Sequence, residues 1–229
     1  MEGPVYESPR VLPCGDRAVT VEFGKSIDPD LNRKVQLLSR QIKSKPFPGL
    51  IDLIPSYRSL LIQYDPGLCS YEELLGLIEG RLASSGEIQD REFRLVEIPV
   101  CYGLEFGPDL EEVAAGHGIT AEEVIRLHAT PVYQVYLIGF TPGFPFLGGL
   151  DPRLFTPRKK TPRKCVPAGS VGLADQQTGI YSLDSPGGWQ LIGRTPVKLF
   201  DLNREDPFFL KPGDQVRFRP IGPDEFGNH

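Results

Sequence analysis

Two hydrophobic periodicities alternate along the N-terminal part of the chain. Leu31, Val35, Leu38 and Ile42 repeat at helical spacing behind Asp28, a residue type suited to an N-cap. Short apolar runs with strand-like spacing flank this helix. They predict strands at residues 18–23, 49–55, 59–64 and 92–100.

A second helix is predicted over residues 70–85, where Ser70 and Glu73 have the spacing of a capping box. The resulting order of strand, helix, strand, strand, helix, strand is that of a ferredoxin-like split βαβ unit. We therefore predict the α+β fold class, with an N-terminal ferredoxin-like α+β domain over residues 1–88 that ends in a polar stretch.

Residues 89–229 follow a different pattern. Two short helices are predicted at residues 107–118 and 120–130, followed by a strongly β-prone run at 132–139. From there to residues 215–221 the chain shows short apolar runs, frequent glycines and regular turn signals, with no further convincing helix. This pattern predicts a closed barrel or another compact β-structure.

Composition and charge narrow the class of protein. The 229 residues carry a formal net charge of -5 and a pI of about 5.3, which argues against a general nucleic-acid binder or a membrane-surface binder. One segment is basic nevertheless, and it is either a solvated loop or a local site for a carboxylate, a phosphate or an acidic partner surface. Its cations are Arg153, Arg158, Lys159, Lys160, Arg163 and Lys164.

The four cysteines and three histidines do not form a metal-binding pattern. The cysteines are far apart without a CxxC pair, and the histidines lack zinc-finger spacing from them. We expect reduced cysteines and no metal site. The sequence begins without a secretory signal pattern, and no apolar stretch approaches the roughly 20 residues that cross a bilayer, so we expect a cytoplasmic protein.

Residues 139–149 combine four glycines and two prolines with Phe140, Phe144 and Phe146. The glycines lack the GxGxxG order of a dinucleotide-binding loop. The segment is either a structural turn or a functional loop. In the second case, it would provide apolar walls and backbone N–H groups that bind an anion or a carbonyl.

Four further positions carry groups suited to chemistry. His128 ends the second short helix, where it could act as an acid, base or ligand, or as a cation that interacts favourably with the helix dipole. Ser170 lies in "PAGSVG", which is not a GxSxG elbow, so nucleophilic catalysis is disfavoured. Trp189 is the only tryptophan and could pack in the core, and Arg194 could form a carboxylate fork. These residues form a binding surface without a complete catalytic set.

The segment from His128 to Pro196 resembles the signature region of the bacterial 5-oxoprolinase B subunit. The motifs "GFTPGF", "PRKKTPRK", "VPAGSVG" and "SPGGWQLIGRT" occur in the order typical of that family. The family also includes the sporulation-kinase inhibitor KipI, and related domains occur in allophanate hydrolase and urea amidolyase. Phe146 and Ser182 depart from the tyrosine and proline that many relatives have there.

The resemblance implies a C-terminal cyclophilin-like β-barrel domain over residues 89–229. It also implies ATP-dependent conversion of 5-oxo-L-proline to L-glutamate in a complex with two partners, a KipA-like C subunit together with an A subunit. ATP would be bound by, or shared with, these partners. The alternative is a KipI-like regulator that inhibits a sensor histidine kinase. A urea or allophanate enzyme would carry a fused amidase or biotin carboxylase region, which 229 residues do not accommodate.

Under this hypothesis the glycine-aromatic loop encloses the lactam ring and His128 is the catalytic residue, positioning or transferring a proton. An arginine pairs with the substrate carboxylate or with the phosphate of an intermediate. The predicted substrate-binding residues are Phe140, Gly143, Phe144, Arg158, Arg163, Gly169, Ser170, Gly188, Trp189 and Arg194.

Overall fold

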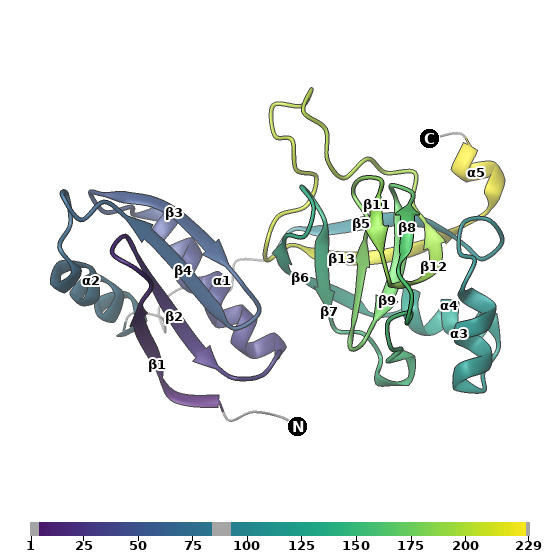
Figure 1. The fold of residues 1–229 in the computed structure, drawn as a ribbon, viewed down its shortest axis with the longest axis horizontal. Helices are drawn as coiled ribbons and strands as arrows, with labels where there is room; N and C mark the ends of the chain where they lie inside the picture. Colours follow the sequence, from purple (N-terminus) through teal and green to yellow (C-terminus); the bar gives the residue numbers. More distant parts are fainter. Residues whose placement is uncertain (1–4, 84–92, 228–229) are drawn as a thin grey trace. The chain divides into compact units, whose positions relative to one another are not determined.

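The computed structural model describes residues 5–83 and 93–227. The chain divides into two compact units (Figure 1), Met1–Glu92 and Phe93–His229. Each unit has its own hydrophobic core. The predicted boundary between residues 88 and 89 lies outside the described residues.

The N-terminal unit is an antiparallel four-stranded sheet in the order β1-β2-β4-β3, packed against two helices. Both predicted helices are confirmed. Asp28 caps the first helix by accepting hydrogen bonds from the N–H groups of Asp30 and Leu31. Ser70 and Glu73 form the predicted capping box at the start of the second helix. The elements are β1 (Val5–Pro13), β2 (Ala18–Gly24), α1 (Pro29–Ser44), β3 (Leu50–Pro55), β4 (Ser59–Tyr64) and α2 (Tyr71–Ala83).

The prediction that residues 92–100 close this sheet is wrong. The edge next to β2 is occupied by β1, which precedes it in the chain. The sequence pattern missed β1 because most of its positions are exposed and it contains Pro9 and Pro13, residues that strands tolerate chiefly at a sheet edge. The predicted closing strand appears as β5 (Leu95–Tyr102) and belongs to the second unit.

The second unit confirms the predicted closed barrel, with strand order β10-β7-β6-β13-β5-β12-β9. Its first strand pairs in parallel with its last, β5 with β13, and this pairing joins the two ends of the unit. Both predicted helices are present as α3 (Leu110–His117) and α4 (Ala121–Ala129). The remaining barrel strands are β6 (Val132–Ile138), β7 (Pro145–Gly148), β9 (Ser170–Ala174), β10 (Gln177–Ile180), β12 (Gln190–Arg194) and β13 (Gln215–Ile221).

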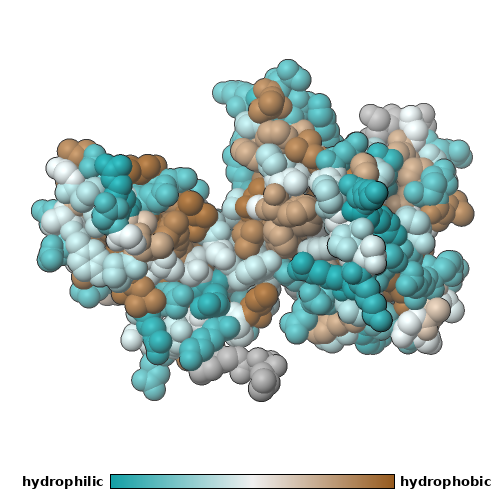
Figure 2. All heavy atoms as spheres, in the orientation of Figure 1, coloured by the Kyte–Doolittle hydropathy of each residue, from teal (hydrophilic) through white to brown (hydrophobic). Residues whose placement is uncertain are grey.

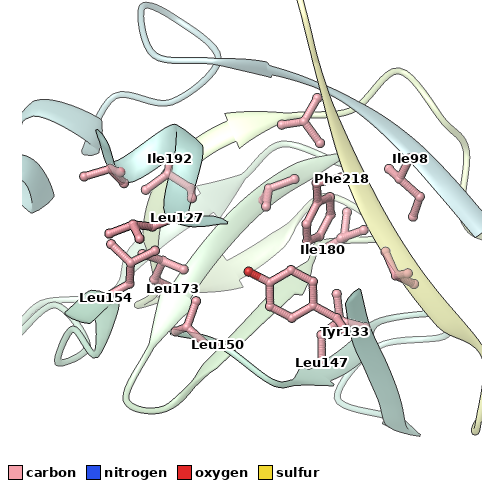
Figure 3. Packing of buried hydrophobic residues seen from close by; sticks show 14 of the residues in the cluster. Ile98, Leu127, Tyr133, Leu147, Leu150, Leu154, Leu173, Ile180, Ile192 and Phe218 are labelled. Atoms are coloured by element: carbon pink, nitrogen blue, oxygen red, sulfur yellow. The ribbon is translucent and has the colours of Figure 1, made fainter. Parts of the chain in front are cut away.

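Large apolar side chains fill the barrel interior (Figure 3). Tyr133 and Phe218 are fully buried with their rings 5.3 Å apart, and Leu127 of α4 belongs to the same cluster. Each fully buried side chain of this size contributes about 1.5–3 kcal/mol relative to an exposed one. The interior is therefore a packed core, which leaves the surface as the place for a ligand.

Outside the barrel wall, β8 (Arg163–Val166) and β11 (Ser185–Gly187) form a two-stranded ribbon. A second, smaller apolar cluster lies with them; it contains Phe144, Val166, Ala174, Tyr181, Trp189 and Leu191. Figure 2 shows hydrophilic residues gathered over the face on which β8 and β11 lie. Two short helices complete the unit, η2 (Pro152–Leu154) and α5 (Pro223–Gly227).

Candidate functional site

A pocket of about 290 Å³ lies beside the β8–β11 ribbon. This volume is near the lower end for small-molecule sites, which suits a ligand the size of a single ring with one or two substituents. The pocket collects residues from the glycine-aromatic loop, the basic segment, the end of β10, and β11 with the turn that follows it. Its lining residues are Phe140, Phe144, Phe146, Arg158, Pro162, Tyr181, Pro186, Gly187, Gly188 and Trp189.

Three buried rings form an aromatic floor, defined here as Phe144, Tyr181 and Trp189. The Phe144 ring stands nearly perpendicular to the other two, with centroid distances of 5.2 Å to Tyr181 and 5.4 Å to Trp189. Edge-to-face pairs of this kind are favourable because a positive ring edge meets a negative ring face. The floor is rigid and apolar, and it can hold a flat ring by van der Waals contact.

Phe140 stands at the mouth of the pocket with 64% of its surface exposed. Its backbone adopts a φ of 64°, in the left-handed region that a bulky residue rarely enters. Such a conformation costs on the order of 1–3 kcal/mol and is concentrated at functional sites. The ring touches the floor edge-on, 5.5 Å from Phe144, so it can cover a ligand that rests there.

Arg158 supplies the positive charge among the described residues that line the pocket. Its side chain is 59% exposed, and its Nε lies 3.4 Å from a carboxylate oxygen of Asp175, which is 64% exposed. An exposed ion pair of this kind contributes little stability, so a ligand anion can compete for the guanidinium. Arg158, one of the residues predicted to bind the substrate, therefore lies in the same pocket as the aromatic floor.

Arg163 occupies a different position, in an ion network around Asp109. Its Nη2 donates to both carboxylate oxygens of Asp109, at 2.6 and 2.8 Å, and Lys159 Nζ donates to the same carboxylate at 2.8 Å. Burial acts to raise the pKa of Asp109, but these hydrogen bonds and one from the Leu191 N–H outweigh it and lower the pKa. Arg163 thus supports the pocket wall from behind instead of lining it.

The same network fixes the turn that forms one side of the pocket. The Lys159 N–H donates to the Gly188 carbonyl at 2.7 Å, and Arg163 Nη1 donates to the Trp189 carbonyl at 3.4 Å. Gly188 and Trp189, which were predicted to bind the substrate, both line the pocket, and their backbone is held by the segment that carries the cations.

Four other predicted residues lie outside the pocket. Gly143 (φ 80°) lets the glycine-aromatic loop approach Phe200, and Gly169 (φ 84°) leaves no room for a side chain, since a Cβ there would collide with the Thr195 carbonyl oxygen. Ser170 is buried in β9, and Arg194 donates from Nε to the Ala168 carbonyl at 2.9 Å.

These outlying residues still act on the pocket through one backbone segment. The Gly169 N–H donates to the Tyr181 carbonyl at 2.6 Å, and the Tyr181 N–H donates to the Ser170 carbonyl at 2.8 Å. The two bonds fix the chain that carries Tyr181 into the aromatic floor. The VPAGSVG motif is therefore placed to shape the site.

His128 does not line the pocket. It is fully buried in the barrel, its ring stacked 4.5 Å from Phe218. Thr178 Oγ1 donates to the Gly172 carbonyl, so it accepts from His128 Nε2 at 2.8 Å, and Tyr102 then donates to His128 Nδ1 at 2.7 Å.

This position corrects the expectations for His128. Burial lowers its pKa to about 3, so at neutral pH the ring is uncharged and cannot serve as a helix C-terminal cation. Both ring nitrogens are engaged in hydrogen bonds and His128 is not among the residues that line the pocket, which argues against the predicted proton transfer to a ligand there. We propose instead that His128 is a structural residue of the barrel.

Sequence reasoning missed four lining residues, Pro162, Tyr181, Pro186 and Gly187, and it placed Phe146 in the apolar loop without naming it as a substrate-binding residue. Pro162 lies within the motif PRKKTPRK, and Pro186 and Gly187 lie within SPGGW, so these motifs were the signal that could have found them. Tyr181 had none, because a tyrosine in a β-run reads as ordinary packing. Among residues 5–83 and 93–227, no group of three or more His, Cys, Asp or Glu side chains could hold a metal ion.

No helix in that same part of the chain is long and apolar enough to cross a membrane.

Comparisons with known proteins agree on one family. Residues 9–210 match the family model "Carboxyltransferase domain, subdomain C and D". The chain is 46% identical over 222 residues to the 5-oxoprolinase B subunit of Bacillus subtilis (strain 168), covering 93% of this chain and 92% of that protein. It is 40% identical over 208 residues to the 5-oxoprolinase B subunit of Haemophilus influenzae, covering 91% and 96%.

A solved structure extends the comparison. The crystal structure of TTHA0988 superimposes with a TM-score of 0.80 at 45% sequence identity and covers 90% of this chain. The present chain spans only 40% of the TTHA0988 chain. Identity of 40–46% over nine-tenths of the chain, together with the matched family model, shows that the protein belongs to the 5-oxoprolinase B-subunit family within the carboxyltransferase-domain proteins.

Proposed function

We propose that this chain acts as the B subunit of an ATP-dependent 5-oxoprolinase and binds the lactam substrate in the pocket beside the β8–β11 ribbon. The observation that carries the proposal is a pocket of about 290 Å³ that combines an aromatic floor with Arg158, the cation among its described lining residues. The substrate, 5-oxo-L-proline, has the matching features: a five-membered ring with a planar amide, and one carboxylate.

In this proposal the chain's own residues bind, orient and shield the substrate. The ring rests on Phe144 and Trp189, Phe140 covers it, and Arg158 holds the carboxylate. Fixing the ring in this way presents the lactam carbonyl in one direction and lowers the entropic cost of reaction. The apolar surroundings also keep stray water from a phosphorylated intermediate.

ATP supplies the activation that an unreactive amide needs, because phosphorylation makes the carbonyl oxygen a better leaving group. The pocket of this chain does not fit a triphosphate: among the described lining residues it presents Arg158 as the cation and has no glycine-rich phosphate loop. We therefore assign nucleotide binding to the partners, the A subunit or the KipA-like C subunit. Because the reaction consumes ATP, we expect it in the cytoplasm.

The fold supports the same assignment. We infer that the barrel is cyclophilin-like and that the N-terminal unit is a permuted ferredoxin-like domain. Its sheet order β1-β2-β4-β3 places the first strand where a ferredoxin-like unit has its last.

Reconstitution tests the proposal. The purified chain is mixed with candidate A and C subunits, 5-oxo-L-proline and ATP, and glutamate is measured with each protein omitted in turn. We expect glutamate only from the complete mixture. Full activity without this chain contradicts the proposal.

The KipI-like alternative is tested with the same preparation. If the complete mixture makes no glutamate and the chain inhibits autophosphorylation of a sensor histidine kinase, the regulatory function replaces the enzymatic one.

A further inference from the structure

The basic segment presents fewer available cations to the pocket than its sequence suggests. Arg153 pairs with Asp151 at 2.7 Å, and Lys159 and Arg163 both pair with Asp109. Arg158 is the member of this segment that lines the pocket. The carboxylate of Asp109 therefore holds two cations of this segment, Arg163 and Lys159, and Lys159 also pairs with Glu112 at 3.0 Å.

Asp109 is built into this position from a distant part of the chain. It lies just before α3, its side chain is only 4% exposed, and it accepts four hydrogen bonds from Arg163, Lys159 and the Leu191 N–H. A buried carboxylate with this many charged donors stays ionised. Its negative charge offsets the cations that it binds.

Arg163 lies close enough to the pocket for its positive charge to affect the electrostatic potential there. Its Nη1 is 3.4 Å from the carbonyl of Trp189, a lining residue. Burial raises the pKa of Tyr181 in the aromatic floor, and the Trp189 N–H and the charges of Arg158 and Arg163 act in the opposite direction. The floor thus lies within the field of both guanidinium groups, one at the mouth and one behind the wall.

We propose that Asp109 is a positioning residue that determines the specificity of the pocket. By holding Arg163 and Lys159, it leaves Arg158 as the cation that binds the ligand anion. The pocket then selects a singly charged cyclic carboxylate over a polyphosphate. The proposal rests on the pocket being the lactam site. Asp109 acts through Arg163 and Lys159 and does not itself touch the ligand.

The test measures binding to the full chain by calorimetry, with Trp189 fluorescence as a local reporter in the pocket. The probes are 5-oxo-L-proline and inorganic pyrophosphate. The first variant is Asp109→Asn, which removes the charge but keeps the size. The matched control is Asp151→Asn, which removes the shorter of the two ion pairs of Arg153, a residue that does not line the pocket.

We expect the wild type to bind 5-oxo-L-proline at least tenfold more tightly than pyrophosphate. In Asp109→Asn the released Arg163 adds a charge-assisted donor for an anion, so the affinity for pyrophosphate rises about tenfold while that for 5-oxo-L-proline stays within threefold. Asp151→Asn changes neither. A folded Asp109→Asn chain with unchanged pyrophosphate affinity overturns the proposal.

Two further outcomes keep the test decisive. If Asp109→Asn does not fold, Arg158→Gln decides, because its side chain is exposed and outside the network. The affinity of Arg158→Gln for 5-oxo-L-proline must then fall at least tenfold. An affinity within threefold of wild type shows that Arg163 or Lys159 binds the carboxylate, and it overturns the proposal. If the wild type binds neither probe, the lactam site itself is wrong; if it binds 5-oxo-L-proline and only the variants disagree, the role of Asp109 is wrong.

Discussion

The buried His128 makes the stability of the barrel depend on pH. Its imidazole is enclosed by Tyr102, Tyr133, Thr178 and Phe218, none of which carries a charge that would stabilise a protonated ring. The pKa of His128 is therefore lowered to about 3 from 6.5, the value that the unfolded chain retains. Lowering the pH protonates the unfolded state first and draws the equilibrium towards it.

The sign and size follow from proton linkage. A histidine buried in its neutral form contributes stability that is fully present above pH 6.5 and is lost as pH falls from there towards 3. Between pH 7 and pH 5 the unfolded state gains about 2 kcal/mol from protonation of this one group. Carboxylates also contribute to the pH dependence of the unfolding free energy over this range. The wild type and any variant of His128 share these carboxylates, so their contribution cancels in the comparison.

The perturbation is His128→Gln, whose amide can accept from Tyr102 and donate to Thr178 but cannot titrate. Urea unfolding is followed by Trp189 fluorescence, which reports on the barrel unit alone because the chain has a single tryptophan. Subtracting the variant's pH 7 to pH 5 change from that of the wild type should leave about 2 kcal/mol. A difference below about 0.5 kcal/mol would refute the assignment of a buried, neutral His128.

Three further substitutions test the site and the two cores. Phe140→Ala should raise the KM of the reconstituted complex for 5-oxo-L-proline at least tenfold, with an unfolding free energy within about 1 kcal/mol of wild type, because the side chain is exposed. Gly169→Ala should lower the unfolding free energy of the barrel by at least about 2 kcal/mol in urea, since a Cβ collides with the Thr195 carbonyl; a loss under about 0.5 kcal/mol would contradict that packing. Asn32→Ala should cost the N-terminal unit about 1–3 kcal/mol by circular dichroism, because two carbonyls in the β3–β4 connection lose their donor, and an unchanged midpoint would contradict this.

Local sequence signals predicted the helices well because their causes are local. The Asp28 cap and the stripe from Leu31 to Ile42 need only a few neighbouring residues to act, and all four predicted stripe positions are buried. The Ser70–Glu73 capping box forms for the same reason.

Partners distant in sequence were not predictable in this way. The apolar pattern of β5 gave its strand character but not its neighbour, which is β13, more than a hundred residues later. His128 was placed at a helix end, yet its burial depends on Tyr102 and Thr178, which are 26 and 50 residues away. A helix terminus reads as exposed until the tertiary structure covers it.

In the candidate site, too, local motifs indicated some residues, whereas contacts between residues distant in sequence could not be predicted. The glycine-aromatic motif pointed to Phe140 and Phe144, and the SPGGW motif to Trp189, all of which line the pocket. The arginines could not be sorted from sequence, because the difference between Arg158 and Arg163 is made by Asp109, 54 residues before Arg163. No spacing rule in the basic segment contains that information.

The most direct test of the lactam site is a crystal structure of this chain with 5-oxo-L-proline. We predict the ring against Phe144 and Trp189, beneath Phe140, with the carboxylate in hydrogen-bonding contact with Arg158. A ligand seated elsewhere, for example against Arg194, or an empty pocket at a ligand concentration that saturates binding in solution, would contradict this placement.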